Sequence, residues 1–146
     1  MSLSEKMLDI IDELESRFQA INGSDDYHNE IDHNLIYLQH MSYQEAEDYP
    51  SISISSFETS SSRQTDQVTY DTPLEIEIFG YIEDSSNADK LKTTIKLAQD
   101  IEKAIYADED LGGNIYNLQL DITVATMNEY GIAKVNVKGV MTYTKT

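Results

Sequence analysis

The side chains best suited to bind a metal ion are three histidines in the first third of the chain. His28, His33 and His40 are five and seven residues apart, with Glu30 and Asp32 between the first two. Neither spacing places two imidazoles on one helical face, as an i, i+4 pair would. The chain also has no cysteine to complete a ligand set. We expect solvated loop histidines and no metal site.

Carboxylates that lie close together are the second candidates for chemistry. Glu75 and Glu77 are two residues apart in an alternating stretch, so they share one face of a strand, where a carboxylate pair can act as general acid and base. An ordinary exposed strand face gives the same pattern. The acidic run Asp108, Glu109 and Asp110 does not continue as a calcium-binding loop, because Gly112 stands where a third oxygen ligand is needed and Gln119 stands where the pattern needs Glu.

Motifs of nucleophilic and phosphate-binding sites are missing from the sequence. It contains no G-x-S-x-G, no G-x-x-x-x-G-K-[ST] and no G-x-G-x-x-G. We therefore predict that no residue is catalytic, that no cofactor is bound, and that the protein is not an enzyme.

Charge and composition restrict the partners. The 146 residues include 27 acidic and 10 basic side chains, a formal net charge of −17, and 40% are hydrophobic. That hydrophobic content supports one core, so residues 1–146 are predicted to form one domain. The charge argues against sequence-specific nucleic-acid binding and against anionic membranes. No signal peptide or membrane span is predicted, which favours the cytoplasm as the site of synthesis and assembly.

Two amphipathic helices must carry much of the core. The first is predicted over residues 7–21, ending near Gly23, and its apolar positions recur at steps of three and four. They are Met7, Ile11, Leu14, Phe18 and Ile21. The second follows the capping residues 84–87 and turns Lys92, Lys96 and Lys103 outward. Its apolar stripe is Ala88, Leu91, Ile95, Ala98, Ile101 and Ile105.

Alternating stretches predict the strands. A short strand is expected within residues 35–39, a second one around 52–55 after Pro50, and a long one over 68–82. Pro73 predicts that the long strand is bent or lies at an edge. Residues 118–124 and 133–143 form a hairpin, with Gly139 a candidate bulge. The expected fold is α+β: a largely antiparallel or mixed sheet of four to five strands, with two helices packed on one face.

A polar segment separates the second and third strands. Its composition is typical of a mobile loop, and we expect it to become ordered at a subunit or partner contact. The segment comprises Glu58, Thr59, Ser60, Ser61, Ser62, Arg63, Gln64, Thr65, Asp66 and Gln67.

The order of these elements resembles the tail terminator proteins of long-tailed bacteriophages, the family of the lambda-type minor tail protein U. The resemblance covers residues 3–144. An amphipathic helix is followed by the acidic run 45–48, which leads into Tyr49-Pro50 and an alternating strand. The resemblance continues with a polar loop, the strand 74–81 and a helix entered through residues 84–86. It ends with a hairpin whose last residues are Val140-Met141-Thr142-Tyr143-Thr144.

The resemblance implies a structural role in the virion. Such proteins form a homo-hexameric ring that caps the tail tube protein, ends tube polymerisation and presents the surface to which the head–tail connector proteins dock. Asp108, Glu109 and Asp110 would then line the lumen. Alternatives are a head–tail connector or tail-completion protein of the neck and, from another class, an acidic DNA-mimic inhibitor.

Net charge alone makes a prediction about assembly. Copies that each carry −17 repel one another, so the free protein should be mainly monomeric at low salt. Salt should favour the ring by screening.

Overall fold

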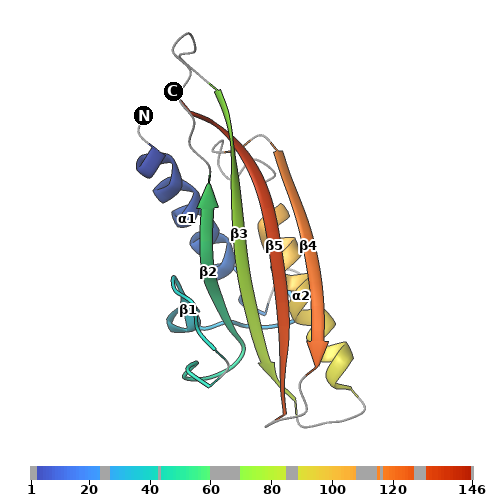
Figure 1. The fold of residues 1–146 in the computed structure, drawn as a ribbon. Coiled ribbons are helices and arrows are strands. Elements are labelled where there is room, and N and C mark those ends of the chain that lie inside the picture. The colour runs from blue at the N-terminus through green and yellow to red at the C-terminus, as the bar shows by residue number, and fades with distance from the viewer. Residues whose placement is uncertain are drawn as a thin grey trace.

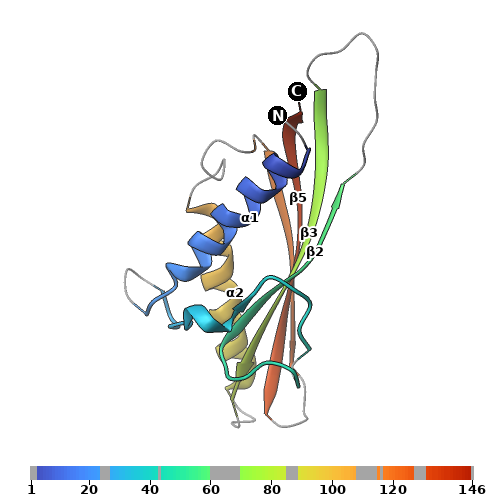
Figure 2. The same cartoon turned by 90° about the vertical axis from the view of Figure 1, so that its left-hand side faces the viewer.

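A five-stranded sheet backed by two helices forms the fold (Figure 1). The computed structural model describes residues 3–23, 27–42, 44–59, 70–84, 89–107, 115, 117–126 and 131–145. The elements are α1 (Leu3–Gln19), a 3-10 turn (His33–Leu35), β1 (Ile36–Tyr37), β2 (Ser51–Thr59), β3 (Tyr70–Glu83), α2 (Lys90–Tyr106), β4 (Asn117–Thr126) and β5 (Ile132–Lys145). This is the predicted α+β fold. Both helices lie on the same side of the twisted sheet (Figure 2).

The strand order is β1-β2-β3-β5-β4. β1 runs parallel to β2, and the other neighbours are antiparallel. β3 is therefore an inner strand over most of its length, but at Pro73 it lies locally at an edge among the described residues, as predicted. Proline is tolerated there because the β2–β3 pairing ends at Thr59 and Leu74, so β3 at Pro73 has β5 as its one neighbouring strand among the described residues.

The core lies between the helices and the inward face of the sheet. α1 contributes Ile10, Leu14 and Phe18, and Ile21 follows just after the helix; all four are fully buried. α2 packs differently from the prediction: Leu91 and Ile95 are exposed, and Thr94, Leu97 and Ala104 are buried instead. A Cβ placed on Gly80 of β3 would stand 2.8 Å from Ile101 Cδ1 and 3.2 Å from Leu97 Cδ2. The bare glycine therefore lets these two side chains approach the sheet, which sets the rotation of α2.

Local irregularities also differ from the prediction. Gly139 stays in regular register with Ile76 and Leu120, so it does not form a bulge. It faces the core, where a Cβ would stand 2.9 Å from Ile76 Cγ1, and glycine is needed for space. The bulge lies in β2, between Ile54 and Ser56. α1 ends at Gln19, and Gly23 (φ 77°) belongs to the turn that follows.

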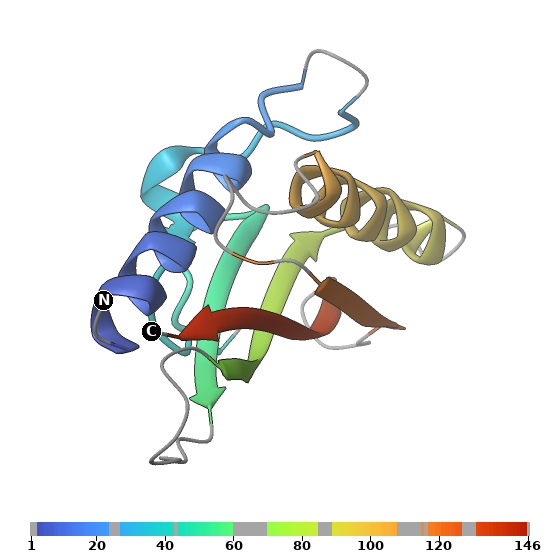
Figure 3. The same cartoon turned by 90° about the horizontal axis from the view of Figure 1, so that it is seen from above.

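A buried carboxylate ties the segment between α1 and β1 to α2. Asp100 is 1% exposed and accepts hydrogen bonds from the backbone N–H groups of His28 (2.9 Å) and Asn29 (2.8 Å). The Asn29 side-chain amide donates a third bond of 2.8 Å. The Lys103 ammonium lies 4.9 Å from the centre of the Tyr27 ring. Seen from above, this segment passes beside α2 (Figure 3).

The described residues of the segment 38–50 pass to the other face of the sheet (Figure 2) and pack over the lower part of β2 and β3. Met41 N–H donates to Ser53 Oγ, which donates to Gln39 O. Beneath this segment lie Phe79, Tyr81 and Ile132, each at most 6% exposed, with Tyr49 packed against them. In the described part of the chain, no helix is long and apolar enough to span a membrane.

Candidate functional site: the open face of the sheet

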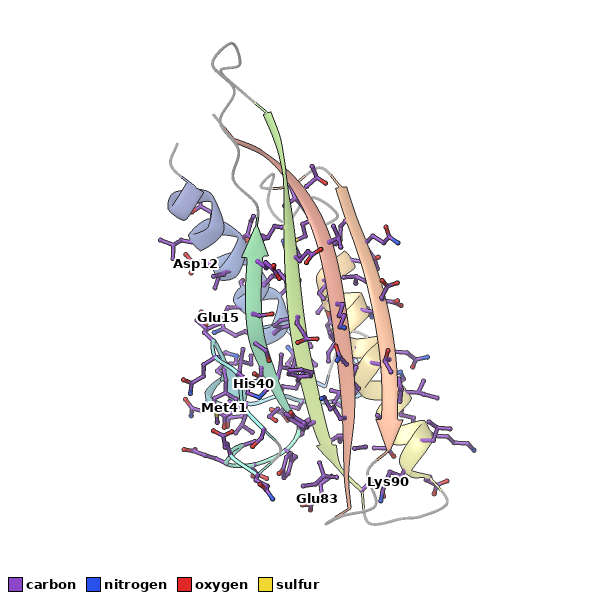
Figure 4. The ribbon with its side chains drawn as sticks, viewed as in Figure 1. Asp12, Glu15, His40, Met41, Glu83 and Lys90 are labelled. Carbon is purple, nitrogen blue, oxygen red and sulfur yellow. The ribbon has the colours of Figure 1, made fainter. Side chains whose placement is uncertain are left out.

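The upper half of the sheet face opposite the helices is open and acidic (Figure 4). It contains a depression of about 330 Å³ to which β2, β3, β4 and β5 all contribute. The outward side chains that line it are Ser56, Glu58, Glu75, Glu77, Asp121, Lys138 and Val140. We call this surface the acidic face.

One row of the acidic face contains its only basic side chain. The register places Ser56, Glu77, Lys138 and Asp121 side by side across the four strands. Lys138 Nζ lies 3.9 Å from Glu77 Oε2, and its side chain is 68% exposed. An exposed pair at this distance contributes little to stability.

The neighbouring row has no base. Glu58 of β2 lies directly opposite Glu75 of β3, and the row continues through Val140 and Gln119. Like charges directly opposite each other on two strands destabilise a sheet. The acidic face therefore carries negative charge that the described residues do not compensate, and a cationic partner would relieve the repulsion.

Removing one of these charges should stabilise the isolated protein. We expect Glu75→Gln to raise the free energy of unfolding by about 0.3 kcal/mol, because the repulsion from Glu58 disappears. Glu77→Gln is the matched control: it also removes one carboxylate from β3 but loses the contact with Lys138, so no gain is expected. Urea denaturation of both variants provides the measurement. Equal gains would show that only net charge matters.

The lower part of this face, where the segment 38–50 packs, holds aromatic and cationic side chains. Lys134 Nζ lies 4.0 Å from the centre of the Phe79 ring, and His40 meets the same ring edge-on at 5.5 Å. Burial raises the pKa of Tyr81, and negative charge on Glu45 adds to the effect. The pKa of Glu45 itself is lowered, because its carboxylate accepts the Ser42 N–H. Tyr81 is therefore neutral near pH 7.

The histidines and carboxylates singled out in the sequence do not form one cluster. His28, His33 and His40 are exposed; the first two lie between α1 and β1, and His40 follows β1. Across the described residues, no three potential metal ligands converge. Glu75 and Glu77 share the outward face of β3, as predicted. Chemically, the acidic face can attract and orient cationic groups.

The predicted interface loop is only partly described. Glu58 and Thr59 belong to β2 and pair with Glu75 and Leu74, so the prediction that the loop begins at residue 58 is wrong. The long strand β3 offers partners for two more residues of β2, and Thr59 is a residue type that favours strands. Residues 60–67 lie outside the described residues, as do Asp108, Glu109 and Asp110.

Sequence reasoning missed most of the acidic face. Asp121 and Lys138 do lie at outward positions of the predicted hairpin, and that alternation was the available signal. Their approach to Glu75 and Glu77 depends on β5 lying between β3 and β4, which periodicity within single strands does not reveal.

Comparison with known proteins gives similarity at the level of the fold. No protein-family model and no curated protein sequence matches the chain. The fold is similar to that of a chain in the solved virion of a native gene transfer agent particle, with a TM-score of 0.48 and 7% sequence identity. The match covers 93% of this chain and 92% of that chain. The likeness is one of overall backbone path.

Proposed function

We propose that this protein is a structural component of a phage-type virion neck, a tail terminator that caps the tail tube as a homo-hexameric ring. In this role it ends tube polymerisation and offers the docking surface for the head–tail connector proteins. The order of the elements along the sequence, which resembles that of tail terminators, supports the proposal. Residues 60–67, between β2 and β3, are proposed as a further contact with the tube or a neighbouring subunit.

The observation that carries this proposal is the acidic face. Four strands present an outward surface that no other described segment covers, and the Glu58–Glu75 pair is repulsive in the free subunit. Contact with basic groups of the tail tube protein would offset that repulsion and fix the orientation of docking. A surface built for such a contact needs no catalytic group.

Reversing charge on the acidic face should abolish capping. We expect Glu58→Lys/Glu75→Lys to fold normally, because both side chains are exposed, and to leave tails overlong when it replaces the wild-type protein during tail assembly. Electron microscopy of tail lengths is the measurement. Asp48→Lys/Glu83→Lys, the same charge change at exposed positions outside the acidic face, should give tails of normal length. Normal tails with the acidic-face variant would contradict the proposal.

The gathering of four carboxylates on one face also favours a second candidate, an acidic DNA mimic. Glu58, Glu75, Glu77 and Asp121 could stand in for phosphates against a basic nucleic-acid-binding protein. A mimic would bind such a protein as a monomer or dimer and compete with DNA. A terminator would bind tube ends and associate with itself. Co-purification followed by a DNA competition assay separates the two functions.

A further inference from the structure

β4 is an edge strand without the features that usually protect an edge. It has ten residues in unbroken register with β5, and no described strand lies on its other side. Its sequence contains no proline or lysine, and Asp121 is its only charged residue. Exposed edges are usually shortened, charged or bulged to prevent pairing with another chain. The inward residues Leu118, Leu120, Ile122 and Val124 are only partly buried.

α2 adds exposed apolar side chains beside this edge. Leu91 is 55% exposed, Ile95 39% and Tyr106 41%. At 100° per residue they lie along one stripe of the helix, with Leu91 half a turn away from Asp100. Because Asp100 faces the segment between α1 and β1, the stripe faces the opposite way, toward β4. We call this stripe and the β4 edge the α2–β4 flank.

The opposite side of the molecule also has a free strand edge. β1 pairs only with Ile52 and Ser53, so within the described residues β2 has no strand on its outer side from Ile54 to Thr59. α1 lies behind this edge (Figure 1) and exposes Leu8, which is 59% accessible. We call this edge and the exposed side of α1 the α1–β2 flank.

The two helices carry opposite charges on their outer surfaces. Four of the ten basic residues are in α2, and Lys92, Lys96 and Lys103 are exposed there against one exposed acid, Glu102. On α1, Asp9 and Asp12 are exposed and Glu15 is half-exposed. Figure 4 marks Asp12 and Glu15 on this helix. The described base of α1, Arg17, is already paired with Glu13 at 2.8 Å. α2 is therefore a basic surface on an otherwise acidic molecule.

We propose that neighbouring copies associate head to tail, with the α2–β4 flank of one copy against the α1–β2 flank of the next. This inference rests on the ring of the proposed function and names its subunit contact. The pairing adds strand β4 of one copy to the free part of β2 in the next and brings lysines to carboxylates. A two-fold pairing of two β4 edges would instead bring two basic helices together and would end at a dimer.

This contact changes the salt dependence expected from net charge alone. At about 0.01 M salt, where the Debye length is about 30 Å, the repulsion between copies of charge −17 dominates. At about 0.1 M the Debye length falls to about 10 Å, which screens that repulsion but preserves close lysine–carboxylate pairs. At about 1 M it is about 3 Å, and these pairs weaken as well. Association should peak at intermediate salt instead of rising steadily.

Charge reversal with complementation tests the contact. One variant, Lys92→Glu/Lys96→Glu, makes the α2 surface acidic, and the other, Asp9→Lys/Asp12→Lys, makes the α1 surface basic. Each variant alone brings like charges together, so its self-association at about 0.1 M salt should fall at least about tenfold. An equal mixture restores opposite charges at every contact of an alternating assembly. It should recover association to near the wild-type level, measured by sedimentation velocity.

The Asp9→Lys/Asp12→Lys variant separates the local contact from net charge. Each copy becomes four charges less negative, so repulsion between whole molecules alone predicts stronger association, whereas the proposed contact predicts weaker association. Asp48→Lys/Glu83→Lys has the same net charge with both flanks intact and should associate at least as well as the wild type. Thermal unfolding followed by circular dichroism confirms that every variant is folded. Unchanged association in the two flank variants overturns the inference.

Cysteine cross-linking gives a second readout that does not depend on strong association in solution. The protein has no native cysteine, so Thr123→Cys on β4 and Ser56→Cys on β2 each introduce one thiol. A short bis-maleimide should cross-link the mixture of the two variants and neither variant alone. Cross-linking of Thr123→Cys alone, or no cross-linking at all, overturns the head-to-tail contact. The cross-linking result and the proposed function fail independently. If the contact is overturned but the wild-type protein still caps tails, the proposed function stands. If the wild-type protein does not cap tails, the proposed function fails whatever the cross-linking shows.

Discussion

Replacing Asp100 with alanine should lower the free energy of unfolding by about 2–4 kcal/mol. The carboxylate is buried and accepts three hydrogen bonds, two of them from backbone N–H groups of the segment between α1 and β1. Alanine leaves these donors without their acceptor, and an unsatisfied buried donor costs about 1–3 kcal/mol. Water can bind some of these donors in the variant, so the loss of stability is smaller than the summed cost of three unsatisfied donors.

Urea denaturation provides the measurement, with two variants for comparison. Asp100→Asn keeps one acceptor oxygen of similar shape and should lose less than alanine. Glu102→Ala, two residues along the same helix but exposed, should change stability by less than about 0.5 kcal/mol. If Asp100→Ala were no more destabilising than Glu102→Ala, the attachment of this segment to α2 would not depend on the carboxylate.

The second large effect is expected at the contact between α2 and the sheet. Gly80→Ala places a methyl group 2.8 Å from Ile101 Cδ1 and 3.2 Å from Leu97 Cδ2. Either these side chains move or the helix shifts outward. Overpacking of this kind costs about 1–3 kcal/mol. The measurement is again the free energy of unfolding, supported by the melting temperature.

A compensating substitution makes this prediction specific. Ile101→Val removes the Cδ1 atom that the new methyl group would strike, and alone it should cost about 0.5–1.5 kcal/mol. The double variant Gly80→Ala/Ile101→Val should lose clearly less stability than the two single losses added together. Simple additivity would show that the crowding is relieved elsewhere, for example by Leu97.

Periodicity predicted the helices well but not the rotation of α2. Both the predicted stripe and the observed one recur at helical spacing, and they differ by part of a turn. The choice between them is made by the surface on which the helix rests. Gly80 opens a place for Leu97 and Ile101, and Asp100 is held by His28 and Asn29. Leu91 and Ile95 then face outward, so their apolar character is available for a contact instead of the core.

The acidic face could be predicted strand by strand but not as a unit. Alternation placed Glu75 and Glu77 outward on one strand, and the same argument applies to Asp121 and Lys138 on the hairpin. Bringing them together requires the strand order, which depends on contacts between residues far apart in the sequence. The covering of Phe79 and Tyr81 by residues 38–50 is likewise a tertiary effect. Alternation along β3 gives no indication of this burial.

The position of β5 between β3 and β4 has a consequence for how the protein is made. β5 emerges from the ribosome after every other described element, yet its ladders join β3 to β4 in the finished sheet. Until β5 emerges, β3 lacks one neighbouring strand along its whole length, and β4 cannot join the sheet. Such long-range pairings form slowly, because the intervening chain must be closed before the contacts stabilise it. A nascent chain of this protein therefore displays the unpaired edge of β3 from the time β3 emerges until β5 follows it.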